Sequence, residues 1–501
     1  MKTIKKILFK AAVKALLFAA IIIAAIMFAV SNGKGGVISK VAAPIADQAG
    51  GSVSSVVVST AAETEPSAGT TAAPASEEAP ATAADAKQTT GTRPEDEWHY
   101  RGYVIDRNGV ILIYNDGIMR VIDEGCNVSH ANLLDSYNSS LSVDRVFEDD
   151  LRTDNPTPTR TNDGHLMGQS VVLTLDSSLQ NGIYQYMEAN RIIGSVTVLG
   201  GGGEVRALVS YPSYDANADF STLNIEPHCC LNRCVEPARP GSAFKMLSAV
   251  TADYFGIHDY SDPGYLEAFG INNWDCRNKP YSSPVSRTLR QGVRASSNCW
   301  FADAFYSIGA SDVKRALDKF FCFSSPLECD FVTLSNTIQL DTPSNLAFAG
   351  FGQRENVSPL YLAMCANAVV TGELNLPYIA DRTVDTVTLK DISVLGAKKT
   401  LSELNGEYTD ELLLGMQDVS ADLGLKVAEG RQLYSKTGTA ETSDDMSKND
   451  IHYIVSVMTD AERSAGSTTA VVFQYINSPA EYASGDKQHM QAILDTVGKH
   501  E

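Results

Sequence analysis

The chain has 501 residues, 44% of them hydrophobic, so it can bury substantial cores and disorder along its whole length is excluded. Acidic residues number 60 against 40 lysines and arginines, which gives a formal charge of −20. Proteins that bind nucleic acid need a basic surface to neutralise phosphates, and the only basic cluster is at the extreme N-terminus, so no nucleic-acid partner is expected.

The first 30 residues predict a membrane anchor. Residues 1–10 form a basic tail, and residues 11–30 are apolar except for one lysine. The lysines are Lys2, Lys5, Lys6, Lys10 and Lys14. About 20 apolar residues cross a bilayer as a helix, and a lysine near its end can reach the headgroups.

The position of these lysines also predicts topology. They lie in the tail and at the N-terminal end of the apolar stretch, so the tail is expected in the cytoplasm and the rest of the chain outside the cell. This makes the protein a single-pass protein of the cell membrane with an extracellular catalytic domain. The alternative is a cleaved signal peptide, because small residues near Ala42 and Ala46 suit cleavage.

Residues 31–96 have the composition of a linker. They consist largely of Ala, Thr, Ser, Pro, Gly and Glu, with almost no aromatic residues. Such a segment buries too little apolar surface to offset its ordering entropy, so we expect a disordered tether between the membrane and the folded part.

Residues 97–168 are expected to form a small β-rich pedestal module. An Asn108-Gly109 pair separates two runs rich in β-branched and aromatic residues, which is the strongest short signal for a β-hairpin. The stretch 132–161 is polar and has few periodic apolar positions, so the sequence assigns it no structure.

Residues 169–501 are expected to form the main domain. Its first elements are a strand at 170–176, a helix at 178–190 and two strands at 195–199 and 205–210. The glycine run 200–203 joins the last two, and because a strand follows it, a hairpin turn is expected rather than a phosphate-binding loop.

A cysteine cluster precedes the first chemical motif. It consists of His228, Cys229, Cys230 and Cys234. Adjacent cysteines chelate one tetrahedral ion poorly, so loop or disulfide roles are favoured over zinc, and no metal site is predicted. The nine cysteines cannot all pair within one chain, and their redox state stays open.

The first motif is Ser242-x-x-Lys245, at the start of a stretch with apolar residues at helical spacing. Residues three apart share a helix face, which brings an amine beside a hydroxyl. A serine hydroxyl needs a neighbouring base to become a good nucleophile, and a desolvated neutral lysine can serve. Alone, the pattern is common by chance and more often marks a capped helix with an exposed lysine.

The second motif is Ser296-Ser297-Asn298, which follows an expected helix at 287–294. The Ser296 hydroxyl could relay protons, and Asn298 could bind a peptide group with one donor and one acceptor. A simple helix cap is the alternative.

The third motif comprises Lys436, Thr437, Gly438 and Thr439, in an expected edge strand. Period two places the two threonines on one face and Lys436 with Gly438 on the other. The threonine hydroxyls can hold a carboxylate, and Gly438 permits close approach to the nucleophile helix. A threonine-rich strand without a chemical role is the alternative.

Strands at 451–458 and 468–476 and a helix at 486–497 close the chain. Strands from both ends of the main domain must then meet in one sheet, with helices between them in the sequence. We therefore expect an α+β fold, with a central antiparallel sheet flanked by helices and a separate helical lobe.

The ordered motifs Ser-x-x-Lys, Ser-x-Asn and Lys-Thr-Gly resemble those of the penicillin-binding protein and serine β-lactamase superfamily. Further stretches resemble the class B penicillin-binding proteins, the monofunctional transpeptidases. These stretches are 101–109, 207–215, 351–353 and 358–360. The resemblance covers residue 97 to the end.

This resemblance implies a peptidoglycan D,D-transpeptidase. Ser242 would be the acylated nucleophile and Lys245 its base, with Ser296 and Asn298 as proton relay and peptide clamp. Lys436, Thr437, Gly438 and Thr439 would bind the substrate's carboxylate end, and the N–H groups of Ser242 and Thr439 would form the oxyanion hole. Stem peptides would be substrates, β-lactams inhibitors and a membrane glycan polymerase a partner, and no cofactor or metal is implied.

Some residues depart from the family's usual pattern. Arg354 stands where a second glycine is common, Ala243 where threonine is common, and 451–453 where an aromatic pair is usual. The module at 97–168 is also shorter than in most class B members. These departures bear on the acceptor side of the site and on partner docking.

The sequence also bears on three alternative functions. A β-lactamase or β-lactam sensor would share the acylation chemistry, but no Glu-x-x-Leu-Asn stretch lies between the second and third motifs. A catalytically silent wall-synthesis scaffold would not need every motif position filled. A Ser-His-Asp hydrolase is disfavoured because no Gly-x-Ser-x-Gly elbow occurs.

Overall fold

A computed structural model describes residues 99–501 except 118, 136–140, 219–227, 263–283, 405, 441–449 and 478–485. The basic tail, apolar stretch and linker expected at 1–10, 11–30 and 31–96 lie outside the described residues. All described residues belong to one compact unit. Within it, none of the helices combines the length and apolar character needed to span a membrane.

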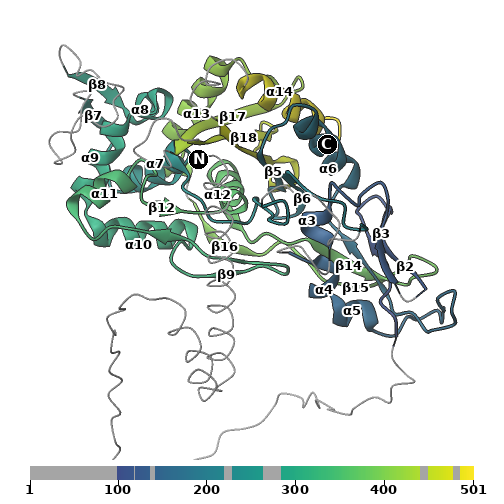
Figure 1. Ribbon diagram of the computed structural model, residues 1–501. Coiled ribbons are helices and arrows are strands. Elements are labelled where there is room, and N and C mark those ends of the chain that lie inside the picture. The colour runs from purple at the N-terminus through teal and green to yellow at the C-terminus, as the bar shows by residue number, and fades with distance from the viewer. Residues whose placement is uncertain are drawn as a thin grey trace, which may run out of the picture. The chain divides into compact units, whose positions relative to one another are not determined.

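The main sheet has five antiparallel strands in the order β17-β18-β19-β5-β6 (Figure 1). They are β5 (Gly194–Gly200), β6 (Val205–Tyr211), β17 (Gln432–Ala440), β18 (Asp450–Thr459) and β19 (Thr469–Asn477). The prediction that strands from both ends of the domain share one sheet is confirmed for β5, β6, β18 and β19, whereas the strand expected at 170–176 pairs with strands of a second sheet. The hairpin at the glycine run is also confirmed, and Gly203 there has φ +99°.

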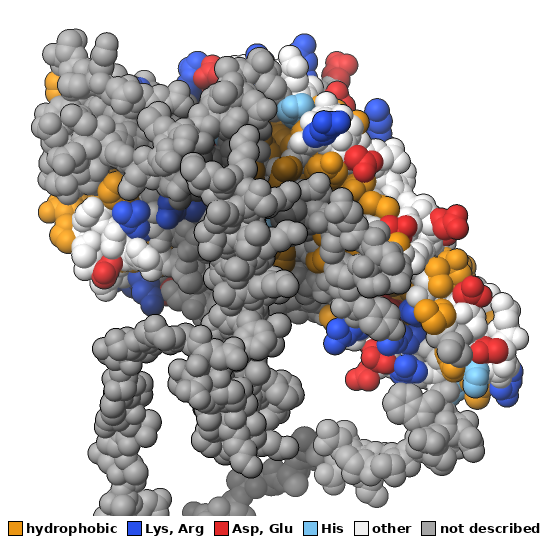
Figure 2. Space-filling model, viewed as in Figure 1, with side chains coloured by type: hydrophobic (Ala, Val, Ile, Leu, Met, Phe, Trp, Pro, Cys, Tyr) orange, Lys and Arg blue, Asp and Glu red, His pale blue; other side chains and the backbone are white. Residues whose placement is uncertain are grey.

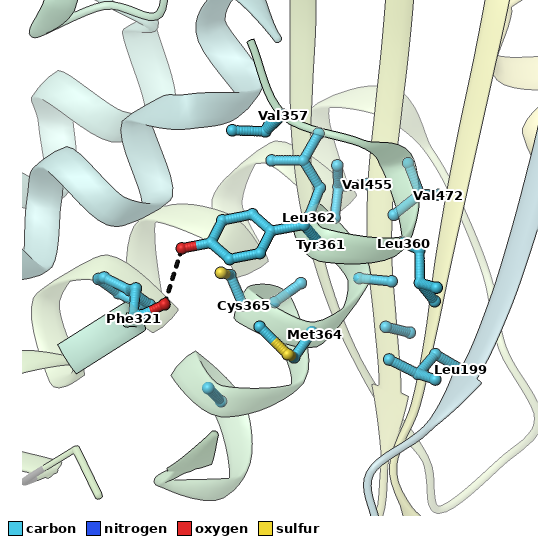
Figure 3. Packing of buried hydrophobic residues seen from close by; sticks show 14 of the residues in the cluster. Leu199, Phe321, Val357, Leu360, Tyr361, Leu362, Met364, Cys365, Val455 and Val472 are labelled. Atoms are coloured by element: carbon cyan, nitrogen blue, oxygen red, sulfur yellow. Dashed lines mark hydrogen bonds between the residues drawn. The ribbon is translucent and has the colours of Figure 1, made fainter. Parts of the chain in front are cut away.

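Helices cover both faces of this sheet. On one face α12 (Pro359–Thr371) packs Leu360 and its neighbours against Val455 and Val472, and the Tyr361 hydroxyl donates 2.8 Å to the Phe321 carbonyl (Figure 3). On the other face α6 (Ser177–Ala189) and α14 (Asp486–Val497) cover alternate residues of the same strands. The strands are therefore apolar on both sides, as a buried central sheet requires.

A helical lobe precedes β17. It contains η3 (Gly241–Phe244), α7 (Lys245–Tyr254), α8 (Leu289–Ala295), α9 (Asn298–Ile308), α10 (Ala310–Phe321), α11 (Pro343–Ala349), η5 (Gly406–Tyr408) and α13 (Asp410–Leu423). The helix expected from residue 287 begins at Leu289, because Thr288 and Gln291 form a capping box. The helix predicted at 486–497, at the end of the chain, is α14 and has the predicted bounds.

A second sheet has the order β15-β14-β4-β1-β2-β3. Its strands are β1 (Val104–Ile105), β2 (Ile111–Asp116), β3 (Met119–Ile122), β4 (Ser170–Leu173), β14 (Ala380–Val384) and β15 (Asp391–Val394). The hairpin predicted around Gly109 is confirmed. Its turn is organised by the buried Asp106, which accepts from the N–H groups of Asn108 and Val110 at 2.8 Å.

Short elements fill the stretch that the sequence left unassigned and the remaining connections. The helices are α3 (Ala131–Leu134), α4 (Val143–Val146), α5 (Glu148–Arg152) and η6 (Ala465–Ser467). The strands are β7 (Asp259–Asp262), β8 (Val285–Thr288), β9 (Leu327–Glu328), β10 (Thr333–Leu334), β11 (Thr337–Ile338), β12 (Glu355–Asn356), β13 (Glu373–Asn375) and β16 (Thr400–Glu403). On the face in Figure 2, acidic and basic side chains are interspersed over the described surface.

Candidate active site

Ser242 lies on η3, the 3-10 turn that leads into α7, with its side chain partly exposed. Gly241 before it has φ +53°, a conformation that glycine adopts without strain. A Cβ on Gly241 would lie 2.2 Å from the Thr439 carbonyl oxygen. The turn is therefore pressed against the edge strand β17 in a way that only glycine allows.

Lys245 begins α7 and its side chain is buried. Its Nζ lies 2.9 Å from Ser242 Oγ, 2.6 Å from Asn298 Oδ1, and 2.7 and 3.2 Å from the carbonyl oxygen and Oγ of Ser296. The rings of Phe301 and Phe351 lie 5.7 and 6.0 Å from Nζ. The first and second sequence motifs thus meet at one nitrogen, inside a partly aromatic enclosure.

The second motif spans the junction between two helices. Ser296 is the C-cap of α8 and has the left-handed conformation φ 50°, ψ 42°, which is rare for a residue other than glycine. Ser297 is the N-cap of α9 and accepts from the Trp300 N–H at 3.2 Å. The helix cap that was the alternative reading is present, but it belongs to Ser297, and Ser296 and Asn298 face Lys245.

The third motif lies on β17, the edge strand of the main sheet. Thr437 and Thr439 are half-buried while Lys436 and Gly438 are buried, as the predicted alternation requires. A Cβ on Gly438 would lie 2.7 Å from the Ala243 nitrogen, so the expected close approach of this strand to the turn that holds Ser242 is confirmed.

Lys436 joins the third motif to the second. Its Nζ donates to Ser296 Oγ at 3.0 Å and to the Thr437 carbonyl oxygen at 2.8 Å. Burial lowers the pKa of Lys436 to about 7, because desolvation disfavours the charged ammonium. Ser296 Oγ therefore lies between the nitrogens of Lys245 and Lys436. A hydroxyl that passes protons between two amines would occupy such a position.

Thr439 has two partners that the sequence did not identify. Gln353 Nε2 lies 3.3 Å from the Thr439 carbonyl oxygen, and His452 Nδ1 lies 3.4 Å from Thr439 Oγ1. The His452 ring also stacks on Tyr475, with ring centroids 5.0 Å apart. Pairing between neighbouring strands is the signal that could have placed His452, since it is the register partner of Thr439.

The residues that depart from the family pattern have local partners. Arg354 Nε donates 2.6 Å to Asn345 Oδ1, and its guanidinium lies 4.5 Å from the centre of the Phe348 ring. Ala243 is buried under Gly438. Arg354 is thus held beside α11.

The described cysteines do not form a metal site. Among the residues that the structure describes, no group of three or more His, Cys, Asp or Glu residues could hold a metal ion. Eight of the nine cysteines lie among the described residues. Within the predicted cluster Cys229 Sγ and Cys230 Sγ lie 3.7 Å apart.

Comparisons with known proteins agree with this geometry. A family model described as the penicillin binding protein transpeptidase domain matches residues 194–495. Among curated proteins, the chain is 27% identical to penicillin-binding protein 3 of Bacillus subtilis over 55% of this chain and 43% of that protein. It is 25% identical to the peptidoglycan D,D-transpeptidase PbpA of Mycolicibacterium smegmatis over 48% of this chain and 54% of that one. The chain spans about half the length of these relatives.

Solved structures share the fold. The imipenem acyl-enzyme complex of penicillin-binding protein A from M. tuberculosis superposes with a TM-score of 0.65 at 19% identity, over 80% of this chain and 99% of that one. The D,D-transpeptidase domain of a peptidoglycan glycosyltransferase from Eggerthella lenta gives the same TM-score and coverage at 18% identity.

Proposed function

The chain belongs to the penicillin-binding protein transpeptidase domain family, and from this premise we propose that it is a peptidoglycan D,D-transpeptidase with Ser242 as its nucleophile. The substrate would be a stem peptide ending in D-Ala-D-Ala, and the acceptor an amine of a second stem peptide. β-Lactams would acylate the same serine.

The observation that carries this proposal is the hydrogen bonding of Lys245. The Ser296 carbonyl and Asn298 Oδ1 can only accept, at 2.7 and 2.6 Å from Nζ. A neutral amine has two N–H groups and one lone pair. If the two N–H groups serve these acceptors, the lone pair is left for the Ser242 hydroxyl at 2.9 Å, which is the arrangement a general base requires.

Acylation then follows in balanced steps. Ser242 Oγ attacks the carbonyl of the penultimate D-Ala as its proton passes to Lys245 Nζ. The proton continues through Ser296 Oγ to the leaving nitrogen of the terminal D-Ala, the C–N bond breaks and an acyl ester remains. An acceptor amine then attacks the ester, loses a proton along the same route and releases Ser242.

Binding groups come from β17 and the nucleophile turn. The N–H groups of Ser242 and Thr439 would stabilise the oxyanion, since these two segments are in contact. The hydroxyls of Thr437 and Thr439 would hold the terminal carboxylate, with Lys436 beneath them. Asn298 would orient the peptide once its carbonyl oxygen is fixed by Lys245.

The superfamily's other reaction, hydrolysis of β-lactams, needs a base that directs water at the acyl ester. A donor peptide ending in D-Ala-D-Ala, an acceptor amine and the purified chain distinguish the activities. Formation of the cross-linked product with release of D-Ala supports the transpeptidase. Rapid hydrolysis of benzylpenicillin without cross-linking would instead support a β-lactamase, and neither reaction would support a silent scaffold.

The cellular setting is also a proposal. Residues 11–30 would anchor the protein in the cell membrane, residues 31–96 would act as a tether, and residues 97–168 would be a pedestal for the catalytic domain at 169–501. A membrane glycan polymerase would be the partner. Protease added to intact protoplasts should remove the catalytic domain, and its survival would contradict this topology.

A further inference from the structure

The position of Ser296 needs support from outside the three motifs. Its left-handed backbone is unfavourable for a serine, yet both its carbonyl and its hydroxyl face lysine nitrogens. Strained conformations persist only where surrounding contacts hold them. Contacts from neighbouring elements must therefore hold this short junction between α8 and α9.

Ser297 provides the attachment. Its Oγ donates 2.5 Å to Asp262 Oδ2 while accepting the Trp300 N–H at the start of α9. Asp262 is only 2% exposed and is the last residue of β7. A hydrogen bond to a carboxylate is stronger than one between neutral groups, and burial strengthens it further.

Asp262 is itself fixed by β8. Arg287 Nε donates 3.1 Å to the same oxygen, Asp262 Oδ2. The backbone carbonyl of Arg287 accepts the Trp300 indole N–H at 3.1 Å. The β7–β8 ladder is thus joined to the first turn of α9 at two points, one through Ser297 and one through Trp300.

We propose that Asp262 is a positioning residue for the second motif, acting through Ser297 to hold Ser296 and Asn298 at Lys245. This inference rests on the proposed transpeptidase function. Asp262 and Ser297 would take no part in bond making. Their loss would let the α8–α9 junction relax, so that the proton relay and the general base are displaced from Ser242.

The test measures acylation by a fluorescent penicillin, separated into the binding constant and the first-order acylation rate of the folded protein. Ser297→Ala removes the hydroxyl and leaves the Asp262–Arg287 pair intact. Asp262→Asn keeps volume and hydrogen bonding but loses the charge. Both should lower the acylation rate constant, Ser297→Ala by about 10–100-fold, with a smaller change in binding. Ser297→Thr, which keeps a hydroxyl, should restore most of the rate.

Asp418→Ala is the matched control. It breaks the ion pair between Arg290 of α8 and Asp418 of α13, without touching Ser297, and should leave the acylation rate unchanged. A wild-type acylation rate in folded Ser297→Ala and Asp262→Asn would overturn the inference even if both melt at lower temperature. If the wild-type chain is not acylated at all, the proposed function fails first, and the inference fails with it.

Discussion

Lys245 Nζ lies 2.9 Å from Ser242 Oγ. Ser242 lies in η3, and Lys245 is the first residue of α7, which follows η3 directly. A base at this distance needs no movement of the backbone to take the proton. The same nitrogen is held by acceptors from the junction before α9. The proposed nucleophile thus lies beside its proposed base, and contacts on the other side hold that base in place.

Replacing this base should slow acylation without unfolding the protein. Lys245→Ala is expected to reduce the rate of β-lactam labelling by about 10²–10⁴-fold, the range typical of general-base catalysis. Stopped-flow fluorescence with a labelled penicillin measures the rate. Lys314→Ala, at an exposed position of α10, is the control and should label at the wild-type rate. Unchanged labelling of Lys245→Ala would remove this residue from the mechanism.

Lys436 should make stability depend on pH. Burial lowers its pKa to about 7, whereas a lysine in an unfolded chain titrates near about 10.4. Between these pH values the unfolded state binds more protons than the folded state, because folding forces Lys436 to give up its proton. This cost to stability is absent above the unfolded pKa and grows as pH falls toward about 7.

Lys436→Met keeps a long side chain and removes the titration. Urea unfolding of both proteins at several pH values from 6 to about 9 should show wild-type stability rising relative to Lys436→Met across that range. A difference that is independent of pH, or that falls as pH rises, would contradict the burial of a titrating ammonium here.

Gly438 should not tolerate a side chain. A Cβ there would meet Ala243 N at 2.7 Å and the Pro240 carbonyl oxygen at 2.8 Å. Gly438→Ala should therefore push β17 away from the nucleophile turn, costing about 1–3 kcal/mol in the free energy of unfolding. Acylation should fall as well. Gly466→Ala, where nothing lies within 4 Å of the added Cβ, is the control. Equal acylation by the two variants would argue against this contact.

Asp144 should be important for the stability of the β1–β3 region. Its fully buried carboxylate pairs with Arg101 and with Arg120, and Arg120 Nη2 lies 2.7 Å from Asp144 Oδ1. Asp144→Ala removes the buried carboxylate that the two arginines share, although Arg101 keeps Glu148 at 3.2 Å, and should cost about 3–5 kcal/mol. The exposed Arg294–Asp422 pair is the comparison, and Asp422→Ala should change thermal unfolding little. Similar effects of both variants would contradict the role of burial.

Local signals in the sequence predicted much of the fold. The Asn108-Gly109 turn, the glycine run at 200–203 and the helix from Asp486 depend on neighbouring residues, and all were confirmed. The three motifs were also found in sequence, because each is short. That all three meet at Ser296, which contacts both Lys245 and Lys436, required the fold.

Contacts between distant segments could not be predicted in this way. Asp262 reaches Ser297 across 35 positions, and Phe351 reaches Lys245 across a longer separation. The pairing of β14 with β4 likewise joins segments about two hundred residues apart, which no local pattern encodes. The helices between 131 and 152 are each only one turn long, too short to show helical periodicity.

Intact mass spectrometry after incubation with benzylpenicillin tests the central claim most directly. The wild-type chain should gain the mass of one penicilloyl group, the adduct should map to Ser242, and it should persist for hours after free drug is removed. Ser242→Ala should gain nothing. An adduct on Ser242→Ala, no adduct on the wild type, or loss of the adduct within seconds with steady drug turnover would contradict a transpeptidase acylated at Ser242.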